Sequence, residues 1–552
     1  MRLYHIIAAI VMVVGPPAAS TLVAQQMRWP DLQAHAATPF DEELVRIDDE
    51  RRSEAGELDL YARLLELHLT TLEDGTWTSE GADEVCRLRV ASTGAEAIEL
   101  LMEDVHVPQG ATIQFFALDG RQLSDAMALD GAEGIMEYSS PMVHADEAVL
   151  EYRQPADASF QGRFTINGLD HAYRFVEDIM REEACHVNVA CHPESNGWED
   201  VIRATVRISV VTPQGNGWCT GTLVNNVRQD CAPYILSAFH CGRTSTAPQF
   251  NQYKFYFNFQ YATCSGGSYS TAQFMTGAQR VAYSDDYAPQ YQGVGGSDFM
   301  LMRTNAVVPD AYDPYWAGWD ATSISSVTED GVCIHHPTGA PKRISSYTQT
   351  LTTGHPMTSS GLLSHYRAKW AATTNGFGIT EVGSSGSGLF KPHATNGPVL
   401  IGTLTGSSSG MTCANNTGTS YFGKMSYHWV NNPNTAALKL KNWLDPDATG
   451  TLVLAGSAHP CGAVASVTSM TTPEVLGAWP NPASTILNIS HTSTGVAAVS
   501  MTDVAGHLVK YWRIDASTRT LDIQDLPNGV YALTLTTVQN EAPLRTKVVV
   551  QH

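Results

Sequence analysis

A run of eight residues near position 385 constrains this chain more than any other stretch. Residues 383–390 read Gly-Ser-Ser-Gly-Ser-Gly-Leu-Phe. Glycine adopts backbone conformations that other residues avoid, so a serine between glycines can present its hydroxyl while neighbouring amides converge on one point. The same residue types also form flexible linkers. The run therefore predicts a catalytic serine if the rest of the chain supplies a base and an acid.

Two upstream segments supply these partners. His240 follows the apolar residues 235–239 and precedes Cys241, and Asp298 stands directly before another apolar segment, residues 299–302. A serine nucleophile needs an adjacent base, and the base needs an acid that fixes its tautomer. Taken alone, the histidine could equally be a packed core residue and the aspartate a turn former. Their joint order favours His240 as general base, Asp298 as its orienting acid and Ser385 as nucleophile.

The charge of the chain is concentrated in its first third. The net charge of the 552 residues is -22, and residues 25–180 hold 32 Asp plus Glu against 11 Arg and no Lys, which is 11 - 32 = -21. No basic patch is present to bind the phosphates of a nucleic acid, so this class of partner is excluded. The length predicts several domains rather than one core.

The chain begins with a pattern typical of secreted proteins. Arg2 precedes a short apolar run, residues 6–14, and small residues follow at Ala18, Ala19 and Ala24. This run is too short to span a bilayer, and residues 1–24 are predicted to be a signal peptide. Export permits disulfide bonds, so the ten cysteines are candidate bridges.

Residues 25–181 are predicted to form an acidic propeptide with an α+β or β-rich fold. Residues 41–72 carry leucines at 60, 64, 67 and 69 with helical spacing, which predicts a helix. Residues 87–176 alternate short apolar runs with turn residues, which is typical of a small β domain. Because this segment carries no catalytic constellation, we interpret it as a propeptide that assists folding or blocks the site. A carbohydrate-binding module is the alternative.

The remaining segments are predicted to be all-β. In residues 182–456, rich in Gly, Ser, Thr, Tyr and Trp, we expect one helix at 435–444 and strands that include 202–211, 218–224, 234–238, 299–303 and 399–404. Residues 457–472 have the composition of a linker. Residues 473–552 are predicted to form a small β-sandwich with strands at 486–489, 497–502, 507–512, 521–523, 530–536 and 547–550.

Residues 185–455 resemble trypsin-fold serine endopeptidases and, among them, the bacterial lysyl endopeptidases. The motifs that carry this resemblance are residues 200–203 (DVIR), 218–226 (WCTGTLVNN), 334–337 (IHHP), 342–345 (KRIS) and 380–387 (TEVGSSGS). It implies a trypsin-like double β-barrel with the site between two six-stranded barrels, and a triad of His240, Asp298 and Ser385. The backbone amides of Gly383 and Ser385 would form the oxyanion hole. No metal or organic cofactor is implied, and the paired His335 and His336 are interpreted as structural.

The resemblance also implies three disulfide bonds. They are Cys185 to Cys413, Cys191 to Cys264 and Cys219 to Cys241, each closing a loop that restrains the unfolded chain. Four cysteines are left over: Cys86, Cys231, Cys333 and Cys461. The sequence does not pair them, and Cys231 with Cys333 is the preferred combination.

Three positions depart from the family pattern. Animal trypsins carry an Asp immediately before the nucleophile, which pairs with the new N-terminus on activation, whereas this chain has Ser384. That ion-pair switch is therefore not available here, as in lysyl endopeptidases. Gly388 stands where a proline is usual and adds backbone freedom. The third departure lies in the substrate pocket.

The pocket predicted from the resemblance carries no charge. The family reads lysine with a buried Asp two residues before an aromatic-Gly-basic run, and this chain has Ser420 there. Thr405 replaces the family's histidine ahead of Gly406, and Thr380 adds another hydroxyl. A lysine ammonium would lose its pairing charge in such a pocket. We therefore predict a weakened or lost preference for lysine.

The maturation junction agrees with this prediction. The first lysine of the chain is Lys254, so no lysine precedes Cys185, and Arg181 is the nearest basic residue. A strict lysyl enzyme could not cut itself there. The sequence therefore predicts cleavage after Arg181, either by an arginine-specific partner or by a relaxed self-cut.

Residues 473–552 resemble the type A C-terminal sorting domain of the type IX secretion system. The matching motifs are residues 480–482 (PNP), 503–506 (DVAG), 521–523 (LDI), 526–531 (LPNGVY) and 546–550 (TKVVV). The resemblance implies passage through the periplasm and outer membrane by the type IX machinery. A fibronectin-like spacer or carbohydrate binder is the alternative.

Together these features predict a secreted or surface-attached serine endopeptidase. It would act as a monomer on protein or peptide substrates through an acyl-enzyme. The alternative is a surface adhesin or binding protein that kept a protease fold without activity.

Overall fold

The computed structural model describes fourteen stretches of the chain. They are residues 28–29, 31–55, 57–129, 137–174, 184–284, 296–354, 363–408, 410–432, 434–462, 477–490, 497–503, 508–514, 520–537 and 544–552. The predicted signal peptide and Arg181 lie outside them. Among the described stretches there is no helix long and apolar enough to cross a membrane. The chain divides into two compact units at residues 463 and 464, which are described separately.

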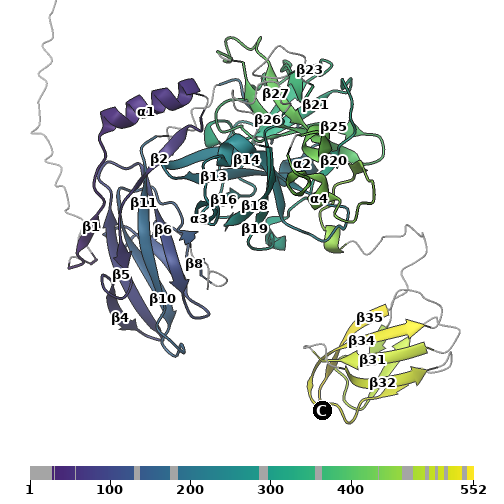
Figure 1. The fold of residues 1–552 in the computed structure, drawn as a ribbon. Helices are drawn as coiled ribbons and strands as arrows, with labels where there is room; N and C mark the ends of the chain where they lie inside the picture. Colours follow the sequence, from purple (N-terminus) through teal and green to yellow (C-terminus); the bar gives the residue numbers. More distant parts are fainter. Residues whose placement is uncertain are drawn as a thin grey trace, which may run out of the picture. The chain divides into compact units, whose positions relative to one another are not determined.

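The N-terminal segment, residues 28–174, is a β structure with one helix (Figure 1). The helix is α1 (Glu42–Ala55). The strands are β1 (Ala34–Ala36), β2 (Leu60–Leu65), β3 (Leu69–Thr70), β4 (Thr76–Glu80), β5 (Asp83–Ala91), β6 (Ala97–His106), β7 (Thr112–Phe116), β8 (Met127–Ala128), β9 (Glu137–Ser139), β10 (Glu147–Pro155) and β11 (Arg163–Ala172).

The helix predicted over residues 41–72 is wrong in its second half. The chain is helical only as far as Ala55, and Leu60–Leu65 and Leu69–Thr70 are strands. Strand β2 pairs with β11 on one edge and with β14 (Gly215–Val224) on the other. Because five of its six residues are buried, β2 shows no alternation of apolar and polar residues. Its leucines therefore matched the spacing of a helix.

The middle segment, residues 184–462, is also mainly β. Its strands are β12 (Val187–Asn188), β13 (Thr205–Thr212), β14, β15 (Tyr234–Ala238), β16 (Lys254–Tyr256), β17 (Phe274–Thr276), β18 (Ala278–Tyr283), β19 (Phe299–Thr304), β20 (Gly318–Asp320), β21 (Gly331–His335), β22 (Arg343–Tyr347), β23 (Thr352–Gly354), β24 (His365–Ala368), β25 (Gly388–His393), β26 (Gly397–Ser407), β27 (Ser420–Lys424) and β28 (Val453–Leu454). Its short helices are α2 (Glu199–Ala204), η1 (Phe239–Gly242), α3 (Ala247–Phe250), η3 (Asp310–Tyr312), η4 (Pro337–Gly339), η5 (Tyr427–Asn431), η6 (Ala436–Leu438), α4 (Lys441–Leu444) and η7 (Pro460–Gly462).

Two sheets build the middle segment, in line with the predicted mainly β, two-part architecture. Strands β13 to β19 belong to a 12-stranded sheet, and β12 with β20 to β28 form a 10-stranded sheet. Each half packs its own apolar core, and a third core, with residues from both halves, includes Trp319 and Trp429. The first sheet does not stop at the middle segment, because it continues from β14 through β2 into β11, β6 and β9 of the N-terminal segment.

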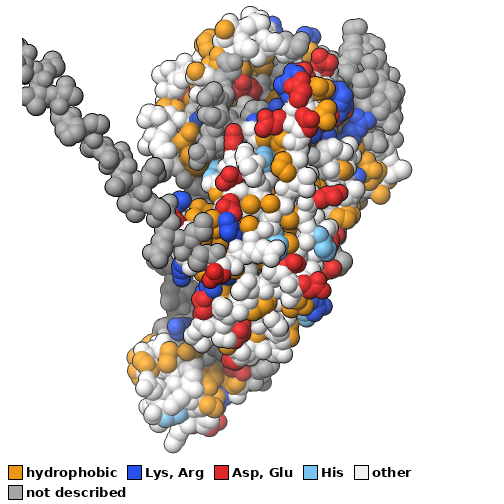
Figure 2. Space-filling view, turned by 90° about the vertical axis from the view of Figure 1, so that its left-hand side faces the viewer, with side chains coloured by type: hydrophobic (Ala, Val, Ile, Leu, Met, Phe, Trp, Pro, Cys, Tyr) orange, Lys and Arg blue, Asp and Glu red, His pale blue; other side chains and the backbone are white. Residues whose placement is uncertain are grey.

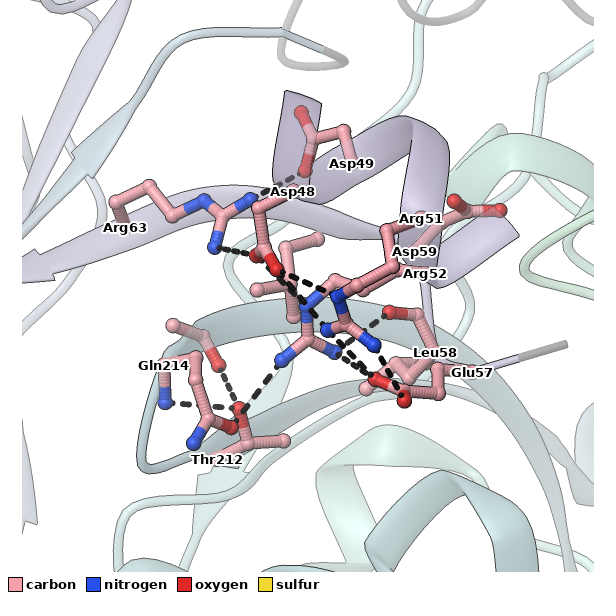
Figure 3. Close-up of polar contacts among 12 residues, drawn as sticks. Asp48, Asp49, Arg51, Arg52, Glu57, Leu58, Asp59, Arg63, Thr212 and Gln214 are labelled. Carbon is pink, nitrogen blue, oxygen red and sulfur yellow. Dashed lines mark hydrogen bonds and ion pairs between the residues drawn. The ribbon is translucent and has the colours of Figure 1, made fainter. Parts of the chain in front are cut away.

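Polar contacts hold helix α1 next to the middle segment, at the junction formed by β2 and β14. Acidic side chains are scattered over the face that Figure 2 shows, which is the left-hand side of Figure 1. At the junction, Arg63 of β2 donates to Asp48 of α1 at 2.7 Å, and Arg52 of α1 donates to Gln214 Oε1 at 3.2 Å (Figure 3). Because Gln214 lies in the turn between β13 and β14, the network reaches the middle segment.

Two local expectations in the middle segment are only partly met. Residues 202–204, expected in a strand, end helix α2, and the strand begins at Thr205. The helix expected over residues 435–444 is split into η6 and α4 because Lys439 adopts an extended conformation, with φ -83° and ψ 139°.

The disulfide pattern confirms three predictions and corrects one. Cys185 is bonded to Cys413, Cys191 to Cys264 and Cys219 to Cys241. The preference for Cys231 with Cys333 is wrong, since Cys231 is bonded to Cys461, and Cys86 and Cys333 are buried free thiols. Cys333 lies in the middle of β21 with its Sγ 3.2 Å from Ser387 Oγ. The Cys231–Cys461 bond instead ties the end of the middle segment to the loop before β15.

The C-terminal unit folds into two small sheets around an apolar core. One sheet joins β29 (Gly477–Trp479), β30 (Ile486–Ser490) and β33 (Thr520–Asp522). The other joins β32 (Leu508–Ile514), β31 (Ala497–Thr502), β34 (Gly529–Thr537) and β35 (Leu544–Val550). Side chains from both sheets, such as Leu487 and Leu533, are fully buried. This confirms the predicted small β-sandwich.

Candidate active site

His240 and Asp298 lie side by side because their strands are neighbours. Strand β15 ends at Ala238, which pairs with Phe299 at the start of β19. His240 follows β15 in the turn η1, and Asp298 precedes β19 with a positive φ of 52°. The His240 ring Nδ1 lies 2.7 Å from Asp298 Oδ2, and the His240 amide donates to Oδ1 at 2.9 Å. The carboxylate thus holds both the ring and the backbone of His240.

The pair is buried on one side and open on the other. The Asp298 side chain is fully buried, whereas 15% of the His240 side chain is exposed. Burial by itself lowers the pKa of His240, but the charge and hydrogen bond of Asp298 outweigh it, so the net pKa is raised from its usual value. The ring is thereby suited to accept a proton from its exposed side.

Ser385 lies on a tight turn that packs against these strands. The turn uses Gly383 and Gly386, with φ of +85° and +82°, conformations that favour glycine. The Ser385 carbonyl accepts a hydrogen bond from the Thr220 amide of β14 at 2.8 Å. A Cβ on Gly386 would lie 2.6 Å from the backbone nitrogen of Ala238. The serine turn is therefore packed against the end of β15, just before His240.

The amides proposed for the oxyanion hole belong to the same turn. Those of Gly383 and Ser385 donate no hydrogen bond to any described residue, whereas the Ser384 amide between them donates to the Glu381 carbonyl at 3.0 Å. A Cβ on Gly383 would lie 2.7 Å from the Gly339 nitrogen. The close approach of the loop around Gly339 fixes the turn, leaving two amides available for an oxygen anion.

Several side chains brace this turn, and one of them, His335, was interpreted as structural from the sequence. Ser384 Oγ lies 2.8 Å from His335 Nδ1, and His335 Nε2 lies 2.9 Å from Ser345 Oγ. His186 Nε2 lies 2.6 Å from Glu381 Oε2. No contact was expected from the sequence for Ser345, His186 or Glu381, because these residues come from separate segments that meet only in the fold. The residue before Ser385 is thus held by a histidine.

His335 and His336 are buried and hydrogen-bonded. His336 Nδ1 lies 2.8 Å from the Ala340 carbonyl. Burial lowers the pKa of both imidazoles well below the usual value, so both are neutral. Within the described stretches, no cluster of three or more His, Cys, Asp or Glu side chains could hold a metal ion.

A cluster of hydroxyl groups lies where the pocket is predicted. Thr380 Oγ1 is 2.7 Å from both Ser420 Oγ and Ser407 Oγ, and the two serine oxygens are 2.9 Å apart. The Trp370 indole donates to Ser420 Oγ at 3.1 Å. These four side chains satisfy one another without a charged group.

One predicted pocket residue, Thr405, is placed differently. Thr405 lies outside the hydroxyl cluster, with its Oγ1 3.0 Å from His365 Nε2. The pairing of β26 with β27 is irregular between Leu404 and Gly406, and the bulge redirects the side chains that follow. Ser407 consequently takes the place expected for Thr405. Neither Ser407 nor Trp370 was identified from the sequence.

Comparisons with known proteins match two parts of the chain. Residues 179–423 match the family described as lysyl endopeptidase, C-terminal domain, and residues 477–551 match the secretion system C-terminal sorting domain. A lysyl endopeptidase of Pseudomonas aeruginosa is 27% identical over 365 residues, covering 62% of this chain and 73% of that protein.

Solved structures with similarity to the chain include two proteases. The thermostable serine protease AL20 from an extremophilic microorganism is 15% identical, covering 40% of this chain and 91% of its own, with a TM-score of 0.29. The protease Anisep from Arthrobacter nicotinovorans is 15% identical, covering 41% and 91%, with a TM-score of 0.28.

The sequence matches have two consequences. The first is that the middle segment is that of a serine protease, which acts on proteins. The second is that the C-terminal unit is a sorting domain for type IX secretion, which sends the protein to the cell surface or the extracellular space.

Proposed function

We propose that this chain, a serine protease related to the lysyl endopeptidases and equipped with a sorting domain, is the precursor of a secreted endopeptidase with a neutral acyl-side pocket. The observation that carries the proposal is the buried Asp298 carboxylate, 2.7 Å from a partly exposed His240, with the Ser385 turn packed on the same strand. Residues 25–181 are then the propeptide, 182–456 the protease domain, 457–472 a linker and 473–552 the sorting domain.

The proposed reaction proceeds through an acyl-enzyme. Ser385 Oγ attacks the peptide carbonyl while His240 takes the hydroxyl proton and then gives it to the departing amine. Asp298 holds the imidazole and stabilises the imidazolium. The Gly383 and Ser385 amides receive the oxyanion of each tetrahedral intermediate. Water, activated by His240, then releases the acyl group and restores Ser385.

Labelling of the serine tests this proposal. A fluorophosphonate probe is expected to label the processed wild-type protein but not a Ser385→Ala variant. Ser326→Ala is the matched control, since it removes an exposed hydroxyl from the loop between β20 and β21 and is expected to keep the label. An unlabelled, folded wild-type protein would favour the alternative, a binding protein without activity.

The specificity proposal rests on the hydroxyl cluster. Ser420 is fully buried and surrounded by Thr380, Ser407 and Trp370. A lysine ammonium entering this environment would find no carboxylate and would lose its water shell, a cost of several kcal/mol. We therefore expect a weak preference for lysine on the acyl side of the cut.

A peptide library measures the specificity directly. The processed wild-type enzyme is expected to cut after several neutral residues, whereas Ser420→Asp is expected to gain cleavage after lysine. Ser408→Asp, in the loop after β26, is the control for an added charge. Exclusive cleavage after lysine by the wild type would refute the neutral pocket.

Maturation after Arg181 is tested by N-terminal sequencing of secreted protein. We expect a mature start at residue 182. A start far from this position would show that another bond is cut.

A further inference from the structure

A buried histidine outside the triad joins the two sheets of the middle segment at the residue before Asp298. His428 lies in η5, which follows β27, and its side chain is fully buried. Its Nδ1 lies 2.9 Å from Ser297 Oγ, and its Nε2 lies 3.0 Å from Thr403 Oγ1. Ser297 stands directly before Asp298, whereas Thr403 belongs to β26. One imidazole thus links the start of β19 in one sheet to β26 in the other.

A neutral imidazole suits this bridge. The ring packs on Phe299, with ring centroids 4.8 Å apart, and burial lowers the pKa of His428 to about 3, so the ring is uncharged. A neutral imidazole donates from one nitrogen and accepts at the other, whereas a hydroxyl group does either. Both hydrogen bonds are therefore made at once, whichever tautomer is present.

Thr403 connects the bridge to the serine turn. It precedes Leu404 on β26, whose carbonyl accepts a hydrogen bond from the Gly386 amide at 2.8 Å. The Leu404 amide donates to the Ser387 carbonyl at 2.9 Å. Gly386 and Ser387 immediately follow the nucleophile. The strand that holds the serine turn is therefore the strand to which the imidazole is bonded.

The other end of the bridge holds a residue with an unusual backbone conformation. Asp298 has a φ of +52°, which a residue with a side chain keeps only where its surroundings hold it. The Ser297 amide before it donates to Ser284 Oγ at 3.3 Å. A Cβ on Gly423 of β27 would lie 2.0 Å from the Ser297 carbonyl oxygen and 2.8 Å from His428 Cε1. Strand β27 and the imidazole thus pack directly on the residue that leads into Asp298.

We propose that His428 is a positioning residue, which sets the place of Asp298 relative to the nucleophile through its two hydroxyl partners. This inference rests on the proposed protease function. The imidazole acts only through Asp298, by keeping the carboxylate 2.7 Å from the His240 ring. Loss of the bridge lets the residues before β19 shift, and a misplacement of about 1 Å slows an enzyme by about a hundredfold.

Truncation of the imidazole is the first test. In the processed enzyme, His428→Ala is expected to lower kcat about tenfold to a hundredfold. KM for a peptide substrate is expected to change less than about twofold, because neither hydroxyl partner of His428 belongs to the hydroxyl cluster of the pocket. An unchanged kcat in the folded variant would overturn the proposal.

Leu444→Ala is the matched control for lost packing. Leu444 of α4 is fully buried in the same apolar core as Phe299, so its truncation also destabilises the middle segment. Measured well below the thermal midpoint of either variant, its kcat is expected to stay within about twofold of the wild type. Equal falls in kcat for Leu444→Ala and His428→Ala would show that lost stability is the cause and would overturn the positioning role.

Two amide side chains separate the two hydrogen bonds. The amide of asparagine reaches about as far as Nδ1 of a histidine, and that of glutamine about as far as Nε2. His428→Asn keeps the bond to Ser297, and its kcat is expected to recover to within about threefold of the wild type. His428→Gln keeps the bond to Thr403 and is expected to recover less. A His428→Asn enzyme as slow as His428→Ala would overturn the role of the Ser297 contact.

A double variant tests whether His428 acts through Asp298. Once Asp298→Asn has removed the carboxylate, loss of the imidazole should cost nothing more. The kcat of the Asp298→Asn/His428→Ala enzyme is therefore expected to lie within about threefold of that of Asp298→Asn alone. Two residues that act independently would give falls in kcat that multiply. A multiplied fall would overturn the coupling and with it the proposal.

Labelling with a fluorophosphonate probe separates failure of this inference from failure of the protease function. We expect the wild type to be labelled quickly and His428→Ala to be labelled more slowly, because the probe also needs Ser385 to be activated by His240. A wild type that is labelled and hydrolyses peptides, beside an equally fast His428→Ala, would overturn the inference and leave the function standing. A folded wild type without label or hydrolysis would overturn the protease function itself.

Discussion

Two acid–base pairs of the same length differ in their access to water. In one, Asp298 lies 2.7 Å from His240, and in the other, Glu99 lies 2.7 Å from Lys254. The first pair belongs to a single segment and leaves 15% of the histidine side chain exposed, whereas the second spans two segments and is sealed from water. The two pairs differ in access to solvent. A pair with one exposed face, the open pair, can exchange a proton with another molecule, whereas a fully buried pair, the closed pair, can only hold two segments together.

The surroundings of the two pairs follow from these roles. Asp298 receives the His240 amide as well as the ring, so the imidazole is fixed in position. Lys254 has Glu99 and the Ser140 carbonyl as partners, and burial lowers its pKa. A buried pair stabilises little against an apolar alternative, but removing one partner is costly. The Glu99–Lys254 pair therefore favours one docking geometry more than it adds affinity.

The largest expected effect comes from breaking the open pair. Asp298→Asn keeps the shape but removes the charge, so the imidazole loses its correct tautomer and its stabilising partner. We expect kcat of the processed enzyme to fall about 10⁴-fold, as in other serine triads. Peptide hydrolysis by purified variant and wild type measures this.

The control for Asp298→Asn is its binding of the N-terminal segment. The Asp298→Asn protein should bind the N-terminal segment as the wild type does, because Asp298 does not touch the junction. A fall in kcat smaller than about tenfold would contradict the role assigned to Asp298.

Breaking the closed pair should act on stability and not on the chemistry. In the uncut chain, Glu99→Gln leaves a buried lysine without its charge partner, and we expect unfolding to become easier by about 3–5 kcal/mol. Chemical denaturation of the Ser385→Ala chain measures the change. Glu147→Gln, which breaks a partly exposed ion pair with Arg89 inside the N-terminal segment, is the matched control and should change the free energy of unfolding by less than about 1 kcal/mol. Equal changes in both variants would contradict the role of burial.

The open pair was readable from the sequence, and the closed pair was not. His240 follows an apolar segment, Asp298 precedes one and Ser385 lies in a Gly/Ser run, and short-range patterns also identified Tyr234–Ala238 and Ala497–Thr502 correctly. Glu99 and Lys254 carry no such signal, since charged residues are rarely buried and their partnership depends on the pairing of β2 with β14.

The other wrong predictions also depend on contacts that local sequence patterns do not reveal. The strand Leu60–Leu65 is buried on both faces and therefore lacks the alternation by which a strand is recognised. Cys231 bonds Cys461, 230 positions away, which lies inside the stretch predicted to be a linker. Ser407 joins the pocket through a bulge, which no spacing rule reveals. Each of these three misses involves contacts between distant segments, whereas the partly met expectations at residues 202–204 and 435–444 concern local boundaries.

A smaller expected effect concerns the pH dependence of catalysis by the His240–Asp298 pair. The general base must be neutral to accept the Ser385 proton, and the structure raises the pKa of His240 through Asp298. Activity is therefore lost as the pH falls through this raised value, which lies above that of an ordinary histidine. We expect kcat/KM to rise with pH with a midpoint above about 6.5. The residual activity of Asp298→Asn should have a lower midpoint, and an unchanged midpoint would contradict the assigned cause.

The smallest expected effect comes from an ion pair with neither role. Arg228 and Asp447 are 2.6 Å apart, but about half of each side chain is exposed. Water and salt screen such a pair, so its length alone confers little stability. Asp447→Asn is expected to leave both the thermal midpoint and kcat within experimental error. If it destabilised the chain as much as Glu99→Gln, burial would not be what distinguishes the two pairs, and the contrast between the open and closed pairs would have to be explained by geometry alone.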